Sequence, residues 1–243
     1  MAGHSKWAKV RHFKGAIDAK RGKIFSKLAR EIMIAVKQGG GDPDMNPRLR
    51  MVLLKCRTAN MPKDNIERAI KKGLGADGGA ENFEELTYEV FAPGGVGLLV
   101  EVNTDNRNRT AAEIRSLVTR AGGTMATPGS VRRLFHRKGQ IIVAREAASE
   151  EALMELALEA GAEDFKTDAQ GYEIITDPAH FEAVHKQIEA RGIKCEAAEV
   201  TELPITTVPV NNAQDAAAVS KLIEALEEHD DVKEVFSNAD LPE

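Results

Sequence analysis

The sequence predicts an α+β protein in which an N-terminal three-helix domain is followed by two ferredoxin-like α/β domains, one inserted in the other. In the first third of the chain, apolar residues recur every three or four positions, which is typical of helices. A glycine-rich segment at residues 75–79 follows, and after it strand-like and helix-like segments alternate. We therefore expect domains at residues 1–75, at 80–136 together with 204–243, and at 137–203.

The helical third begins with a glycine-containing arm, residues 1–22, that we expect to be mobile. From Lys23 onward one apolar face predicts a helix, with Ile24, Leu28, Ile32 and Val36 spaced four apart. Asn46 and Pro47 are suited to cap and start a second helix. A third is expected over residues 62–72, with Gly73 just after it.

The remaining two thirds contain both strands and helices. Residues 86–91 and 96–102 predict a hairpin, and a helix is expected from Asp105 or Asn106 to about Arg120. Two strands are predicted at 131–136 and 140–144. Residues 140–203 follow the order strand, helix, strand, strand, helix, strand, which is a split βαβ arrangement. The tail, residues 205–243, predicts a strand, a helix and a strand that return to complete the middle domain.

Composition excludes several classes of protein. Hydrophobic residues make up 42% and charged residues 29% of the 243 positions, as in globular proteins. No apolar run approaches the roughly 18 residues of a membrane span, and no secretory signal is visible, so a cytoplasmic location is expected. The two cysteines, Cys56 and Cys195, give neither a disulfide framework nor zinc spacing, and each is expected to be a small buried side chain.

Charge is distributed very unevenly along the chain. Residues 1–72 contain 18 lysines and arginines against 6 acidic residues, a net charge of +12. The rest therefore contains 15 basic against 32 acidic residues, a net charge of −17. This asymmetry favours a basic part that binds a polyanion, while the alternative is that the basic third docks on the acidic remainder.

Most of the candidate nucleic-acid-binding residues lie in the arm and the first helix. Lysine and arginine neutralise phosphates, and Trp7 could stack on a base; the alternative for Trp7 is that it anchors the arm onto the helices. Arg107 and Arg109 lie in a polar turn, residues 103–110, whose other interpretation is helix capping. The full set is Lys6, Trp7, Lys9, Arg11, His12, Lys14, Lys20, Arg21, Lys23, Lys27, Arg30, Arg107 and Arg109.

Nothing in the sequence predicts an enzyme. The histidines at 136, 180, 185 and 229 are scattered, and no Ser/His/Asp or Cys/His arrangement is evident. The glycine-rich segment 93–97 is followed by a strand rather than a helix, so it is interpreted as a turn and not a phosphate-binding loop. We expect no catalytic residue, no metal site, no cofactor and no small-molecule substrate.

Several motifs resemble those of the YebC/PmpR family across essentially the whole chain. They are Met-Ala-Gly-His-Ser-Lys-Trp at 1–7, Lys-Arg-Gly-Lys-Ile-Phe at 20–25, Asn-Pro-Arg-Leu-Arg at 46–50, Asn-Met-Pro-Lys-Asp-Asn-Ile at 60–66, Tyr-Glu at 88–89, Pro-Gly-Gly-Val-Gly at 93–97, Thr-Asp-Asn-Arg-Asn-Arg-Thr at 104–110 and Gly-Ser-Val at 129–131. Phe13 departs from the family, which often has a basic residue there.

The resemblance implies three domains, no cofactor, and one of two functions. Members of the family are commonly described as DNA-binding transcriptional regulators. Others, including the mitochondrial translational activator of cytochrome oxidase, resemble ribosome-linked translation factors, and bacterial relatives are linked to relief of stalling at proline runs. The residues themselves leave duplex DNA and ribosomal RNA open as partners. A mobile basic arm suits a crowded RNA cavity, and the lack of a recognisable helix-turn-helix argues against sequence-specific reading of DNA.

Overall fold

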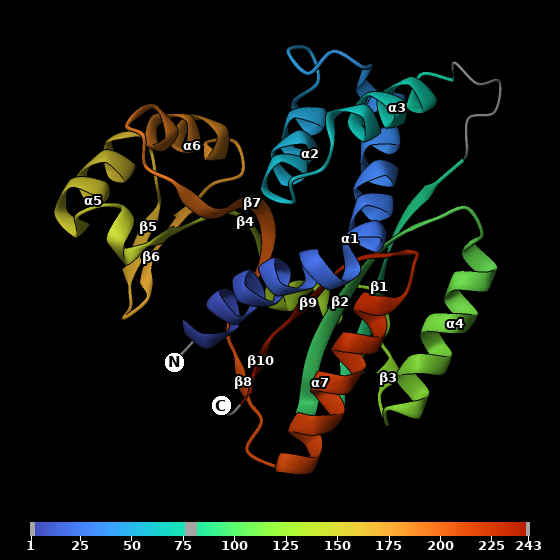
Figure 1. Ribbon diagram of the computed structural model, residues 1–243. Helices are drawn as coiled ribbons and strands as arrows, with labels where there is room; N and C mark the ends of the chain where they lie inside the picture. Colours follow the sequence, from blue (N-terminus) through green and yellow to red (C-terminus); the bar gives the residue numbers. More distant parts are fainter. Residues whose placement is uncertain (1–2, 76–81, 242–243) are drawn as a thin grey trace. The chain divides into compact units, whose positions relative to one another are not determined.

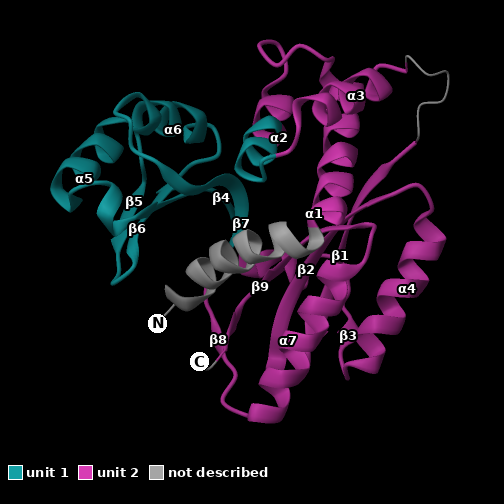
Figure 2. Ribbon diagram, in the orientation of Figure 1, with its two compact units in different colours: residues 1–19, 53–60, 137–203 teal, residues 20–52, 61–136, 204–243 magenta. Residues whose placement is uncertain are grey.

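The computed structural model describes the backbone of residues 3–75 and 82–241, and the side chains of residues 21–75 and 82–241. Two compact units are present (Figure 2). The larger comprises residues 20–52, 61–136 and 204–243, and the smaller comprises residues 1–19, 53–60 and 137–203. The protein is α+β, with three helices first and two strand-rich parts after them (Figure 1).

The N-terminal helices are α1 (Gly3–Gly39), α2 (Pro47–Thr58) and α3 (Lys63–Gly73). Helix α1 begins well before Lys23, where the sequence predicted its start. No proline precedes Pro43, and lysine, arginine and alanine outweigh the cost of the scattered glycines. The helical assignment does not test the mobility of residues 1–22, which stays a prediction.

Asn46 joins the end of α1 to the start of α2. Its Oδ1 accepts a hydrogen bond from the amide of Leu49 at 3.0 Å, which confirms the predicted N-cap. Its Nδ2 donates to the carbonyls of Ala35 and Gly40, both at 2.8 Å. The side chain is 3% exposed. One buried amide therefore satisfies backbone groups of two successive helices, which fixes the angle of the turn between them.

The larger unit contains a four-stranded sheet with the strand order β3-β1-β2-β9. Strands β1 (Glu84–Ala92) and β2 (Val96–Thr104) form the predicted hairpin, with Gly94 at φ 72° in the connecting turn. Strand β3 (Thr124–Met125) pairs with β1, and β9 (Val232–Ser237) pairs with β2. The end of the chain thus returns to this sheet. Strands β8 (Val208–Pro209) and β10 (Ala239–Asp240) form a small parallel pair.

Both faces of β2 are buried. On one face its alternate residues pack with helices α4 (Arg107–Arg120) and α7 (Ala213–Glu228), in a cluster that includes Leu98, Ile114 and Leu222. On the other face Leu99 packs against Val131, Phe135 and Phe236. Strand β2 therefore lies between two apolar layers, whereas β1 is largely exposed.

The smaller unit also contains a four-stranded sheet, with the order β5-β6-β4-β7, as a split βαβ arrangement requires. Its elements are β4 (Phe135–Ala144), α5 (Glu150–Glu159), β5 (Asp164–Thr167), β6 (Gly171–Thr176), α6 (Phe181–Ala190) and β7 (Cys195–Pro204). The two strands predicted at 131–136 and 140–144 are instead one, β4, preceded by a short 3-10 turn at Arg132–Leu134.

Gly139 explains that error. It falls in the gap between the two predicted strands, where glycine favours a turn, but it lies inside β4 opposite Thr176. A Cβ atom there would approach the Thr176 side chain and come within 2.8 Å of Phe181 Cβ. The glycine is required by close packing rather than by a turn. Among the described residues, no helix is long and apolar enough to cross a membrane.

Candidate nucleic-acid interface

The structure does not test most of the predicted arm. The side chains of Lys6, Trp7, Lys9, Arg11, His12, Lys14 and Lys20 lie outside the described residues. Arg21 is the first described side chain and is exposed. The role of these residues in nucleic-acid binding stays a prediction.

Three predicted contact residues, here called the α1 cations (Lys23, Lys27 and Arg30), meet the C-terminal end of α7. Lys23 Nζ donates to the carbonyl of Glu228 and lies 3.2 Å from Asp230 Oδ1. Lys27 Nζ donates to the carbonyl of Glu227 at 2.6 Å. Arg30 Nη1 donates to the carbonyl of Asp230 at 2.8 Å.

Helix physics accounts for this arrangement. The last carbonyls of a helix lack partners within it and carry its partial negative charge, so cations are favoured there. Burial, together with the positive charge of Lys23, lowers the pKa of Lys27 to about 8, against the attraction of Glu227 and Asp230. The α1 cations therefore cap α7. These three residues therefore follow the alternative given for the uneven charge distribution, in which the basic part of the chain docks on the acidic part.

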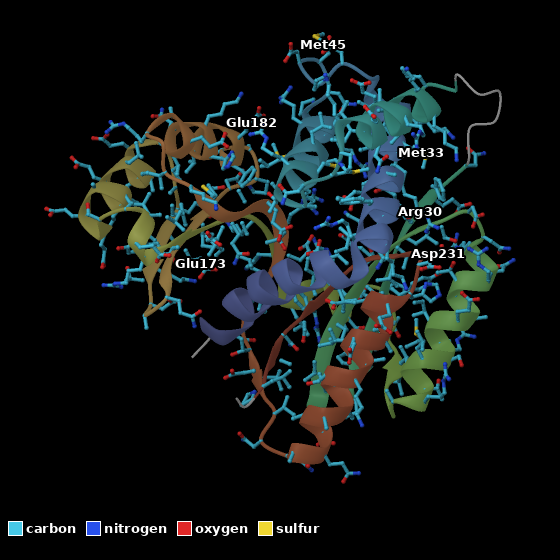
Figure 3. The ribbon with its side chains drawn as sticks, in the orientation of Figure 1. Arg30, Met33, Met45, Glu173, Glu182 and Asp231 are labelled. Atoms are coloured by element: carbon cyan, nitrogen blue, oxygen red, sulfur yellow. The ribbon has the colours of Figure 1, made fainter. Side chains whose placement is uncertain are left out.

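Asp231 connects α1, α4 and the end of α7. This buried carboxylate, 5% exposed, accepts hydrogen bonds from Arg109 at 2.7 Å, from Thr110 at 2.7 Å and from Arg30 at 3.0 Å. Figure 3 shows Arg30 on α1 beside Asp231 in the connection from α7 to β9. Burial alone would raise the pKa of Asp231, but the bonds from Arg109 and Thr110 outweigh it and lower the pKa.

The polar turn at residues 103–110 caps α4, as one of its two interpretations predicted. Asn106 Oδ1 accepts from the amide of Arg109 at 3.1 Å, and Thr104 Oγ1 accepts from the amide of Asn106 at 2.9 Å. The Arg109 guanidinium is paired with Asp105 and Asp231, and the hydrogen bond that it donates to Asp231 raises its pKa. Arg107 is exposed.

Cations of α2 also have intramolecular partners. Arg48 pairs with Glu85 of β1 at 2.8 Å, and Arg50 donates to the carbonyl of Pro43 at 2.7 Å. In the smaller unit, Lys55 lies 3.6 Å from Glu199 and Arg57 lies 3.5 Å from Glu189. Much of the basic charge in the described part of the first 72 residues is therefore engaged within the protein.

Sequence reasoning missed a cluster that the fold assembles from distant residues. His229 Nε2 lies 2.8 Å from Glu113 Oε2, and His229 Nδ1 accepts from the amide of Asp231 at 3.1 Å. Ligand atoms of Glu113, His229 and Asp231 lie within 4.8 Å of one another, a spacing that could suit a metal ion. However, both ring nitrogens of His229 already form hydrogen bonds. The Asp231 carboxylate already accepts hydrogen bonds from Arg109, Thr110 and Arg30. The cluster is satisfied without an ion.

An open groove of about 540 Å³ lies over the same residues. Carboxylates outnumber lysine and arginine side chains in its lining, so it does not favour a polyanion. The lining residues are Lys23, Arg30, Asp105, Arg109, Glu113, Glu228, His229, Asp230 and Asp231.

Helices α2 and α3 are joined by residues 59–62, with Asn60 at φ 53°. A turn this short occurs in helix-turn-helix proteins, which the sequence did not reveal. The outer face of α3 nevertheless exposes Asp64 and Glu67 beside Arg68 and Lys71. The helix as a whole has four basic and two acidic residues, a net charge of +2, but Asp64 and Glu67 would oppose insertion of this face into a DNA groove.

A loop that contains the Gly-Ser-Val motif is held by Glu89 of β1. The Glu89 carboxylate accepts from the amides of Gly129 and Val131 at 2.6 Å and of Arg132 at 2.9 Å. Burial opposes ionisation, but these three bonds lower the pKa of Glu89. Both motifs that resembled the family, at 88–89 and 129–131, therefore contribute to one structural unit.

Comparison with known proteins covers the whole chain. A family profile described as "TACO1/YebC protein N-terminal domain" matches residues 5–76, and another described as "TACO1/YebC second and third domain" matches residues 83–239. A Leptospira biflexa protein named "Probable transcriptional regulatory protein" is 52% identical over 243 residues, which are 100% of this chain and 98% of that protein. A Treponema denticola protein of the same name is 53% identical, with the same coverage.

A solved structure shares the fold. The crystal structure of a conserved hypothetical protein from Aquifex aeolicus superposes with a TM-score of 0.83 at 48% sequence identity, covering 93% of each chain. Family profiles that together match nearly the whole sequence, and relatives at about half identity over its full length, lead to one conclusion: the chain belongs to the TACO1/YebC family.

Proposed function

We propose that this protein is a nucleic-acid-binding regulator of gene expression, a DNA-binding transcriptional regulator that contacts the phosphate backbone through its N-terminal arm. The observation that carries the proposal is the charge of the first 72 residues, +12 in a chain whose total is −5. The names of the Leptospira and Treponema relatives support a regulatory role.

The arm is the favoured contact because the α1 cations are engaged elsewhere. Lys23, Lys27 and Arg30 bind the end of α7, whereas the chain before them supplies Lys6, Lys9, Arg11, Lys14 and Lys20, opposed only by Asp18. Trp7 and His12 are proposed to contact the nucleic acid beside them. Lysine and arginine recognise phosphate rather than base identity, so affinity should depend strongly on salt and weakly on sequence.

A second candidate is a translation factor that associates with the ribosome through ribosomal RNA and relieves stalling, for example at proline runs. The mixed charges of α3 favour it, because the helix that would read a DNA groove exposes Asp64 and Glu67. Backbone recognition by an arm suits folded RNA as well as duplex DNA.

Crosslinking in cells, followed by sequencing of the bound DNA and RNA, separates the two candidates. Promoter DNA is expected if the protein regulates transcription, and recovery of ribosomal RNA alone would overturn that proposal. In purified protein, the triple variant Lys6→Ala/Lys9→Ala/Lys14→Ala should make the salt dependence on duplex DNA shallower by about 2.7 in log–log slope, at about 0.9 for each lost phosphate contact. An unchanged slope would exclude the arm as the contact.

A further inference from the structure

Helix α4 has a charge unlike that of the other helices of the acidic part. It contains four arginines and one glutamate, a net charge of +3. In contrast, α5, α6 and α7 have net charges of −4, −1 and −3. A positive helix in a region whose net charge is −17 marks a surface that attracts polyanions locally.

The residues of α4 are arranged so that its arginines border a neutral face. Thr110, Ile114 and Val118 are buried against the larger unit. Small or neutral side chains occupy the opposite side of the helix, which is exposed and consists of Asn108, Ala112, Ser116 and Thr119. At about 100° per residue, Arg115 lies on one side of these four residues and Arg120 on the other.

The arginines of this surface are available for binding. Among the described side chains, neither Arg107 nor Arg115 has a carboxylate partner, and both are exposed. Arg120 donates through Nε to the carbonyl of Ser116 at 3.3 Å, a bond that leaves its terminal amino groups at the surface. The single carboxylate of α4, Glu113, is turned to His229 at 2.8 Å.

We propose that the outer face of α4 is a second contact with the nucleic-acid phosphate backbone, separate from the N-terminal arm. This inference rests on the proposed function and adds a binding surface to it. Arg115 and Arg120 bind phosphates on either side of the neutral face, and Arg107 extends the contact at the start of the helix. Asn108, Ser116 and Thr119 can donate hydrogen bonds to phosphate and sugar oxygens.

The chemistry of the face favours a nucleic acid over other partners. It lacks an exposed large apolar side chain, which the core of a protein interface or an interfacial membrane helix requires. Ala112 at its centre allows a backbone to approach closely. The α1 cations, by contrast, are held by carbonyls at the end of α7 and just after it, and are less accessible to phosphate.

The test measures binding of the full-length protein to a 20-base-pair duplex DNA and to a duplex RNA of equal length, across 50–200 mM salt. The variant Arg115→Ala/Arg120→Ala should make the log–log salt slope shallower by about 1.8 on duplex DNA, because two phosphate contacts are lost. When salt rises from 50 to 200 mM, the affinity of this variant for duplex DNA should therefore fall about twelvefold less than the affinity of the unmodified protein. A second variant, Ala112→Glu, keeps every arginine and should weaken binding by placing a carboxylate at the centre of the face.

The matched control is Arg191→Ala/Lys194→Ala, which removes two exposed cations after α6 and so reproduces the change in net charge. A shallower slope than that of the control, on either duplex and with unchanged thermal melting, supports the proposal. Equal slopes for the Arg115→Ala/Arg120→Ala variant and the control, with Ala112→Glu binding normally, would overturn it. If the unmodified protein itself shows no salt-dependent binding to either duplex, the proposed function fails instead.

Discussion

Replacing Asp231 by asparagine tests whether this carboxylate holds α1, α4 and the end of α7 together. Asparagine keeps the size of the side chain, but it removes the charge and turns an amino group toward the donors of Arg109 and Thr110. A hydrogen bond to a charged group contributes about 1.5–3 kcal/mol, and solvent partly screens the Arg30 pair. From the Thr110 and Arg30 bonds we expect Asp231→Asn to lower the free energy of unfolding by about 2–4 kcal/mol, measured by urea denaturation at pH 7.

Asp230→Asn is the matched control, because it removes the neighbouring charge from a side chain that is 75% exposed. It should cost about 0–1 kcal/mol. The lowered pKa of Asp231 adds a pH test. The stabilisation from the Asp231 carboxylate is fully present above the unfolded pKa of about 3.9 and is lost as the pH falls through the folded pKa. The free energies of unfolding of the Asp231→Asn variant and the unmodified protein should therefore converge below about pH 4. Equal stability of the two variants at pH 7 would refute the reasoning.

Three further predictions concern other parts of the molecule. Replacing all three α1 cations by alanine should lower the free energy of unfolding by about 1–3 kcal/mol, seen in urea denaturation, since the C-terminal carbonyls of α7 lose their partners; unchanged stability would contradict a capping role. Glu89→Gln should speed tryptic cleavage after Arg132 at pH 7, because the carboxylate that holds the loop loses its charge; cleavage at the original rate would show that another contact orders the loop. Gly139→Ala should destabilise the smaller unit by about 1–3 kcal/mol in thermal melting, since the added methyl group collides with Phe181, and a melting point at or above that of the unmodified protein would argue against close packing.

Local sequence signals predicted many of the elements. Asn46 and Pro47 marked the start of α2, and hydrophobic periodicity found the buried face of α1. Element order alone predicted the split βαβ arrangement of the sheet in the smaller unit. The boundary of β4 was missed because a glycine in a strand has the same local signal as a glycine in a turn. Only its packing partner, Phe181, distinguishes the two cases.

The candidate site shows a different limit. The sequence identified the α1 cations as candidate contacts, but it could not show what they face. Their partners, at the end of α7 and in the connection after it, lie about 200 residues further along the chain. The same holds for Glu113 and His229, which are 116 positions apart and seemed unrelated in sequence. Pairing between distant charges depends on topology, which local patterns do not contain.

The position of β9 at the end of the chain has a consequence for synthesis. Strand β2 ends at Thr104, and its partner β9 begins only at Val232. At 5–20 residues per second, a ribosome needs roughly 6 to 26 s to make the residues between them. The nascent protein therefore has an unpaired edge on its central hairpin throughout that interval, and the α1 cations lack their partners at the end of α7 for most of it. The strands β4 to β7 are contiguous in the chain and can assemble meanwhile, so the inserted part should mature before the unit that surrounds it.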